Sequence, residues 1–120
     1  EKLKQNRSET TAQSYSDLLQ YIKSNFADPM FDMNQVADHL GVSIYTASRM
    51  IKTITGINFR KYLNDMRVEY ARDLLLTTDL PVNDIAVKAG FSSSSYFISI
   101  FRKTESITPS NFRKQHGDDA

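Results

Sequence analysis

Apolar residues recur at helical spacing in the segment between residues 14 and 28. They occupy positions i, i+3, i+4, i+7 and i+11 of one stripe, formed by Tyr15, Leu18, Leu19, Ile22 and Phe26. A stripe of this kind is typical of an amphipathic helix that buries one face. Ser14 has the side chain of an N-cap, and Asp28-Pro29 predicts the end of the helix because Pro disfavours helical geometry in the residue before it. Residues 1–13 are polar and lack this period, so we predict a linker or a frayed terminus there.

Two shorter apolar stripes follow, and each is bounded by residues that favour helix ends. Asp32 and Gln35 have the spacing of a capping box at the start of the first stripe. Gly41 predicts the left-handed backbone that ends this helix. Ser43 can cap the next helix, and Gly56 closes it. The inward positions of the two helices are Val36, Ala37 and Leu40, then Ala47, Met50, Ile51 and Ile54.

A long stripe after this predicts a helix from Asn58, its N-cap, to about Thr77. Its apolar face consists of Phe59, Tyr62, Leu63, Met66, Tyr70 and Leu74. Off this face, Glu69 and Arg72 have the i, i+3 spacing of an ion pair.

Three short helices are predicted in the rest of the chain. Pro81 lies near the start of the first, and Gly90 lies at its end. Ser92 or Ser93 caps the second, and Thr108-Pro109 starts the third. Their inward positions are Ile85, Ala86 and Ala89, then Phe97, Ile100 and Phe101, and finally Phe112. The predicted fold class is therefore all-α, with about seven helices.

The chain contains an internal repeat. Residues 34–43 resemble residues 83–92 at an offset of 49, and residues 50–52 match residues 100–102 at an offset of 50. Each copy has a small Ala that lets two helices cross closely, a Gly that permits a sharp turn, an apolar residue that fills the corner and a Ser that caps the second helix. These pairs are Ala37 and Ala86, Gly41 and Gly90, Val42 and Phe91, and Ser43 and Ser92. The pattern predicts two helix-turn-helix units joined by the long helix.

This organisation divides the sequence into five segments. We predict a linker or disordered terminus at 1–13, a first helix-turn-helix subdomain at 14–57 and a linker helix at 58–78. A second helix-turn-helix subdomain follows at 79–116, and 117–120 form an acidic tail. The chain starts at Glu1, and we interpret it as part of a longer protein.

The quoted repeat carries a family resemblance, which covers roughly Tyr15 to Lys114. The motif is Ile85-Ala86-x-x-x-Gly90-Phe91-x-x-x-Ser95-Tyr96-Phe97-x-x-x-Phe101-Arg102, followed by Thr108-Pro109-Ser110-x-Phe112-Arg113. With Tyr62-Leu63-Asn64-x-x-Arg67 and Ala71-x-x-Leu74-Leu75, it resembles the AraC/XylS family of bacterial transcription regulators. The departures from the family pattern are Ser106 in place of Gly, Ala47 and Ile51 in place of larger Leu and Phe, and Ser99 in place of a longer polar residue.

The resemblance implies a function and partners. It implies sequence-specific binding of double-stranded DNA for transcription regulation in the bacterial cytoplasm, with base contacts at Tyr45, Ser48 and Arg49. It also implies an upstream sensory or receiver domain in the full-length protein and contact with RNA polymerase. The operator, the inducing signal and the choice between activation and repression do not follow from these residues, although we class the protein with the activators.

Composition narrows the other function classes. The net charge is only +1, but residues 31–116 hold 11 Lys and Arg against 8 Asp and Glu, so the mild basic excess lies in the predicted DNA-binding part. The chain has no Cys, which excludes disulfides, thiolate metal sites and Cys nucleophiles. His39 and His116 lack ligand companions, and the Ser run at 92–95 lacks a nucleophile elbow. We therefore expect no enzyme activity, no catalytic residue, no cofactor, no metal site and no membrane contact.

Candidate DNA contacts lie opposite the apolar stripes of the second helix of each unit. We expect Arg49 to reach a base edge, in a bidentate contact with guanine that is worth roughly 1–3 kcal/mol of discrimination. Tyr45 is expected to pack on a thymine methyl or to contact the DNA backbone. Thr46, Ser48 and Lys52 complete the first face, and Ser95, Ser99 and Arg102 form the second. The further predicted DNA-binding residues, at helix starts or with basic side chains, are Ser43, Arg60, Lys61, Ser93, Ser94 and Lys103.

The second face carries short or apolar side chains apart from Arg102, and it includes Ile98. We therefore expect mostly phosphate contacts and shape recognition from the second unit, and more base reading from the first. A helix of about 20 residues spans about 30 Å, and successive major-groove faces lie about 34 Å apart. One molecule is thus expected to place its two reading helices in adjacent grooves.

Arg67 is interpreted as a structural ion-pair partner in preference to a DNA contact, and Arg113 is open to both interpretations. The alternative function is a helical protein–protein interaction module.

Overall fold

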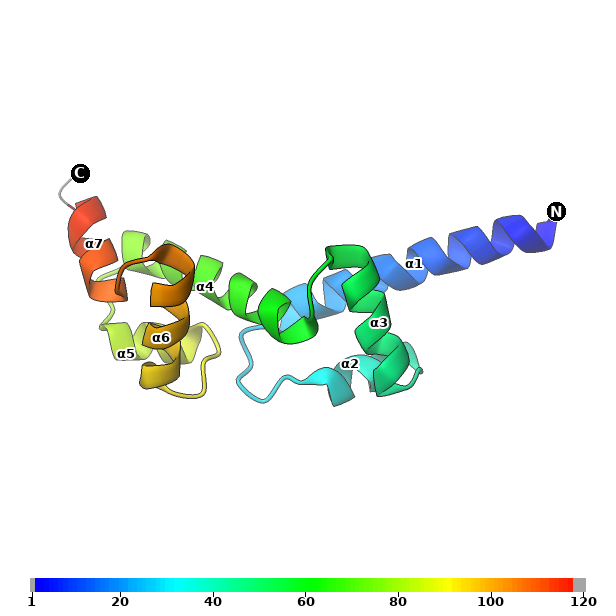
Figure 1. Cartoon of the computed structure of the whole chain (residues 1–120), viewed down its shortest axis with the longest axis horizontal. Coiled ribbons are helices and arrows are strands. Elements are labelled where there is room, and N and C mark those ends of the chain that lie inside the picture. Colours follow the sequence, from blue (N-terminus) through cyan, green and yellow to red (C-terminus); the bar gives the residue numbers. More distant parts are fainter. Residues whose placement is uncertain (1, 118–120) are drawn as a thin grey trace. The chain divides into compact units, whose positions relative to one another are not determined.

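The computed structural model describes residues 2–117, with side chains from residue 13 onward. Within this part, all regular structure is helical, and the all-α class with seven helices is confirmed (Figure 1). The helices are α1 (Lys2–Asn25), α2 (Met33–Leu40), α3 (Ile44–Thr55), α4 (Phe59–Thr77), α5 (Val82–Lys88), α6 (Ser94–Glu105) and α7 (Pro109–Gly117).

The α1 helix begins earlier than the sequence pattern predicts. It runs from Lys2, so residues 2–13 are helical although their sequence lacks a helical period, and Ser14 lies inside the helix and is not an N-cap. The stretch contains no Gly or Pro. Once the C-terminal half of α1 is formed and packed through Leu18 and Ile22, adding further turns of good helix formers costs little.

The chain divides by its contacts into two units. Unit 1 contains α1 and Phe31–Tyr62, and unit 2 contains Phe26–Met30 and the described chain from Leu63 onward. The division falls inside α4, whose first turn belongs to unit 1. The linker helix is therefore built into both units.

Unit 1 is a small core of helices α1, α2 and α3, which pack against one another. Its fully buried side chains are Leu18, Ile22, Val36, Ala47 and Ile51. Phe31, which lies just before α2, has its ring 5.6 Å from that of Tyr21 and 5.8 Å from that of Phe59. Ala37, the small residue of α2 that the repeat predicts at this crossing, is 3% exposed and leaves room for α3 to approach closely.

Both ends of α2 follow the predicted cap chemistry. The Asp32 carboxylate accepts from the Gln35 backbone N–H at 3.1 Å, and the Gln35 side chain accepts from the Asp32 backbone N–H at 3.2 Å. Gly41 has φ 70° and ends α2, as predicted. Val42 is 36% exposed, so the expectation that it fills the corner of the turn is wrong.

Unit 2 has a larger and more aromatic core. The rings of Phe91 and Phe97 lie 5.0 Å apart, those of Phe97 and Phe101 lie 5.7 Å apart, and those of Phe101 and Phe112 lie 5.4 Å apart. This chain of tilted and edge-on contacts joins the turn after α5 to α6 and α7. The buried face of α4 is wider than the predicted stripe, because Val68, Ala71 and Leu75 are also buried.

Two arginines tie the backbone of unit 2 together. Arg67 Nε donates to the Phe26 carbonyl at 2.7 Å, and its Nη2 donates to the Asp28 carbonyl at 3.0 Å. Arg113 donates to the carbonyls of Leu75, Thr78 and Leu80 at 3.2, 3.1 and 2.6 Å. Both side chains thus satisfy carbonyls that follow or end a helix and have no helical partner. Arg67 is structural, as expected, but its partners are carbonyl groups and not the carboxylate of an ion pair.

Burial changes the electrostatics of Arg67. The side chain is 7% exposed, and this desolvation lowers the pKa of Arg67 below its usual value, against the opposing effects of Tyr96 and Asp28. The guanidinium keeps its charge, because an arginine side chain stays protonated in proteins.

The predicted pairing of Arg72 with Glu69 is replaced by a tertiary ion pair. Arg72 Nε lies 3.0 Å from the Glu105 carboxylate at the end of α6. The same guanidinium lies 6.0 Å from the Phe112 ring centroid. A residue brought close by folding therefore takes the place of the local partner.

Candidate nucleic-acid interface

The first turn of α3 and of α6 is held by a serine cap. The Ser43 hydroxyl oxygen accepts from the Thr46 backbone N–H at 3.0 Å, and the Ser93 hydroxyl oxygen accepts from the Tyr96 backbone N–H at 3.1 Å. The choice between Ser92 and Ser93 is thus decided for Ser93. Each cap fixes where the helix begins and, with it, which side chains face outward.

The outward face of α3 is polar and basic. Tyr45 is 71% exposed, and Ser48, Arg49 and Lys52 are exposed on the same side of the helix. Arg49 Cζ lies 5.6 Å from the centroid of the Tyr45 ring, in a cation–π contact. This contact restricts the rotamers of a side chain that otherwise loses considerable entropy on binding a ligand.

Thr46 and the start of α4 add further exposed groups to unit 1. Thr46 is exposed, and Arg60 and Lys61 are exposed in the first turn of α4. The Asn58 side-chain oxygen accepts from the Lys61 backbone N–H at 2.9 Å, which confirms Asn58 as an N-cap. These exposed side chains are accessible to an anionic partner.

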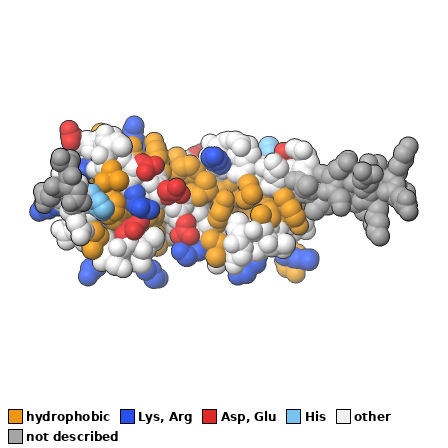
Figure 2. All heavy atoms as spheres, turned by 90° about the horizontal axis from the view of Figure 1, so that it is seen from above, with side chains coloured by type: hydrophobic (Ala, Val, Ile, Leu, Met, Phe, Trp, Pro, Cys, Tyr) orange, Lys and Arg blue, Asp and Glu red, His pale blue; other side chains and the backbone are white. Residues whose placement is uncertain are grey.

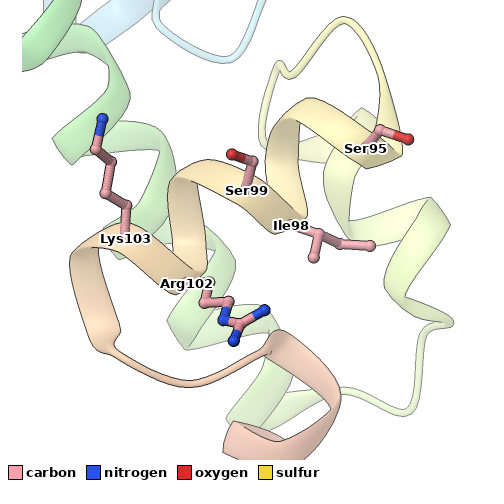
Figure 3. Close-up of a pocket in the computed structure, with 5 residues that line it drawn as sticks. All are labelled: Ser95, Ile98, Ser99, Arg102 and Lys103. Atoms are coloured by element: carbon pink, nitrogen blue, oxygen red, sulfur yellow. The ribbon is translucent and has the colours of Figure 1, made fainter.

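The outward face of α6 is an open hollow. It is lined by Ser95, Ile98, Ser99, Arg102 and Lys103, which all come from α6 (Figure 3). At 100° per residue, these positions form a stripe with Ile98 at one edge, Lys103 at the other and the two serines between them. Figure 3 shows Ile98 and Arg102 extending to one side and Lys103 to the other.

The structure brings the predicted site residues into two groups. One group lies on α3 and the first turn of α4, and the other lies on α6. Ser94 is half-buried, while the other predicted site residues are exposed.

Ile98 lies on the α6 face but was not among the predicted site residues. The signal that places it on the face was its i+3 spacing from Ser95 and its i−4 spacing from Arg102.

The two histidines of the chain both pack against aromatic rings. The His39 ring stacks on Tyr21, with 3.9 Å between the ring centroids, and the His116 ring lies 4.3 Å from that of Phe112. Over the described residues, no group of three or more His, Cys, Asp or Glu side chains is placed to hold a metal ion. In the same part of the chain, no helix combines the length and the apolar character that crossing a membrane requires.

Charge on unit 2 is mixed on one side of the molecule. On the face shown in Figure 2, acidic and basic side chains of this unit lie next to one another. This face therefore has no large area of one charge that would indicate the charge of a ligand. The individual side chains of α3 and α6 are the better guide to what each helix can bind.

Comparisons with known proteins match this architecture. A family model described as a helix-turn-helix domain matches residues 36–115. The regulatory protein PocR of Salmonella typhimurium is 37% identical over 97 residues, which cover 81% of this chain and 32% of PocR. The transcriptional activator RhaS of Escherichia coli is 35% identical over 106 residues, which cover 88% of this chain and 38% of RhaS. The chain thus spans about a third of the length of the curated relatives it matches.

A solved structure matches over nearly the whole of its own chain. It is the C-terminal domain of the two-component response regulator yesN from Fusobacterium nucleatum, with a TM-score of 0.79 and 36% identity. The match covers 82% of this chain and 95% of that domain. The two-unit helical architecture therefore matches that of the C-terminal domain of a response regulator.

Proposed function

Because this chain belongs to the AraC-type helix-turn-helix family of transcription regulators, we propose that it binds double-stranded DNA in a sequence-specific manner to control transcription. The observation that carries this proposal is the pair of capped helices, α3 and α6, each with an exposed face that holds basic side chains. A capped helix of this size fits the major groove of B-form DNA, where each base pair presents a distinct pattern of donors and acceptors.

The two faces take different parts in binding. Arg49 reads a guanine through its planar guanidinium, and its stack on Tyr45 holds it ready for this contact. The α6 face contributes phosphate contacts through Arg102 and Lys103 together with shape recognition. Phosphate contacts to unit 1 come from Lys52, at the groove edge, and from Ser43, Arg60 and Lys61. Ser48 joins Arg49 and Tyr45 in contacting bases, and Thr46 lies beside them on the same face.

The two helices enter successive major grooves on one side of the duplex. The length of α4, which is 19 residues, corresponds to about 28 Å at 1.5 Å per residue, close to one helical turn of DNA. A site of two unlike half-elements then suffices, and no palindrome is needed. The organisation proposed from the sequence, two subdomains at 14–57 and 79–116 joined by a linker at 58–78, follows this plan.

In this proposal, the chain is one part of a larger regulator, and another domain of that regulator receives the signal that controls DNA binding. The yesN domain is the C-terminal part of a two-component response regulator, and we extend this to an upstream sensory or receiver domain here. Contact with RNA polymerase and a place in the cytoplasm follow from the proposed role in transcription.

Phosphate contacts are also proposed at the start of α6. Ser93 and Ser94 lie there, where backbone N–H groups would face a phosphate.

A salt titration separates this proposal from a protein–protein interaction module. Binding to a duplex selected from a random pool is expected to weaken steeply as salt rises, because phosphate contacts release counterions. Affinity that is indifferent to salt and to duplex sequence would favour the protein-interaction alternative.

Two single substitutions test the division between the faces. Arg49→Ala is expected to reduce the preference for the selected site over random duplex by roughly 10- to 100-fold, whereas Ser95→Ala is expected to change it by less than about threefold. Competition binding with both duplexes measures the two preferences. Equal losses of specificity would defeat the division, and the salt slope of each variant shows whether DNA binding as such survives.

A further inference from the structure

The α6 face places one aliphatic side chain where the α3 face has a hydroxyl. The two faces correspond at an offset of 50, so Ile98 stands where α3 has Ser48, while Arg102 stands where α3 has Lys52. Ile98 is 36% exposed, in contrast to its buried neighbours Phe97 and Phe101. A single exposed aliphatic residue is common on protein surfaces, so its surroundings decide what it means.

Those surroundings are polar and basic. Ile98 lines the open hollow of α6 with Ser95, Ser99, Arg102 and Lys103 (Figure 3). The two basic side chains suit phosphates, and the two serines accept or donate a hydrogen bond to many base edges and therefore discriminate weakly. The isoleucine is the one side chain of this hollow that makes no polar contact.

We propose that Ile98 recognises the 5-methyl group of a thymine in the half-element bound by α6. The inference rests on the proposed DNA binding and assigns a base preference to the unit with few polar base readers. The thymine methyl is the apolar feature that the major groove presents, and aliphatic or aromatic side chains pack against it. Cytosine lacks this methyl, so the contact distinguishes thymine from cytosine without a hydrogen bond.

The size and the salt dependence of this contact follow from its chemistry. Removing one methyl group from an apolar contact weakens binding by about fourfold, the ratio that corresponds to about 0.8 kcal/mol. The contact releases no counterion, so this ratio stays constant as salt changes, while the total affinity falls.

Deoxyuridine tests the assignment because it differs from thymidine only by the missing 5-methyl. The probe is the duplex selected from a random pool with this chain, in which each thymine is replaced singly by deoxyuracil. We expect one position, in the half-element protected by α6, at which replacement weakens binding of the parent chain about fourfold. At this position Ile98→Ala and Ile98→Ser bind the two duplexes equally well.

A matched control and a rescue complete the experiment. Val87→Ala removes methyl groups from an aliphatic side chain of α5 that is 67% exposed, and it keeps the full sensitivity to deoxyuracil. Cytosine at the sensitive position weakens parent binding, and 5-methylcytosine recovers part of the loss, because it restores the methyl without the thymine oxygen. Circular dichroism of the Ile98 variants checks that the helices are retained.

Three results overturn the inference. They are a selected α6 half-element without thymine, a parent chain indifferent to every deoxyuracil replacement, and an Ile98→Ala variant that keeps the parent's sensitivity. Each is distinguishable from failure of the proposed function, since the parent's salt-dependent binding to the selected duplex and its dependence on Arg49 are measured in the same assay. Loss of these as well would reject DNA binding itself.

Discussion

The two helix-turn-helix units share a backbone plan and differ in what fills it. Both second helices start at a serine cap, and both end at a residue with positive φ, Gly56 at 80° and Ser106 at 69°. The first turn leaves Val42 36% exposed, whereas the second buries Phe91 to 3%. The caps and turns thus define the motif, and the core beneath it can be built from small aliphatic or from large aromatic side chains.

On the exposed faces, the larger side chains lie in the first unit, whereas in the cores they lie in the second. The α3 face carries Arg49 stacked on Tyr45, while the corresponding positions of α6 are Ser99 and Ser95 at an offset of 50. The unit with the smaller core side chains thus has the larger side chains on its exposed face, where we propose that bases are read. Since the core and the face of an amphipathic helix lie on opposite sides, each can change without disturbing the other.

The largest expected contrast is at the corner of each turn. Phe91→Ala should destabilise unit 2 by about 3–5 kcal/mol, because it removes a buried ring that contacts Phe97 and leaves a cavity. Val42→Ala should cost less than about 1 kcal/mol, because the side chain is partly exposed. Hydrogen–deuterium exchange with mass spectrometry reports the two units separately. Comparable loss of protection from the two substitutions would show that Val42 fills its corner after all.

The next contrast is at the glycine of each turn. A Cβ on Gly90, at φ 97°, would lie 2.8 Å from the Phe26 carbonyl oxygen and 2.9 Å from Ala27 backbone atoms, while a Cβ on Gly41 would meet nothing within 4 Å. Gly90→Ala is therefore expected to cost about 3 kcal/mol, from strained backbone together with a clash. Gly41→Ala should cost about 1–2 kcal/mol from backbone strain alone. Denaturant unfolding measures both, and equal costs would mean that the Phe26–Met30 segment moves aside at little expense.

The smallest contrast is at the C-terminal caps of α3 and α6. Ser106 is the non-glycine residue with positive φ in the described chain, and Ser106→Gly should raise the stability of unit 2 by about 0.5–1 kcal/mol. Gly56→Ser should lower the stability of unit 1 by a similar amount. Thermal unfolding of the two variants should shift in opposite directions. A Ser106→Gly variant that is no more stable would indicate that the serine side chain compensates for its backbone strain.

Local features of the sequence predicted the motif and its ends. Apolar periodicity located the helices, and the caps at Asp32, Ser43 and Asn58 follow from side chains that reach a backbone N–H within three residues. The exposed face of α3 followed as well, because the face opposite a buried stripe is fixed by helical geometry. These features depend on short stretches of chain, so the order of residues was sufficient to determine them.

Tertiary structure alone decided which partners distant residues take. The carbonyl acceptors of Arg67 lie 41 and 39 residues away, at Phe26 and Asp28, and Arg72 pairs with Glu105 in preference to the local Glu69. No local pattern determines such outcomes, because the energy of each depends on burial and on backbone that only the folded chain brings within reach.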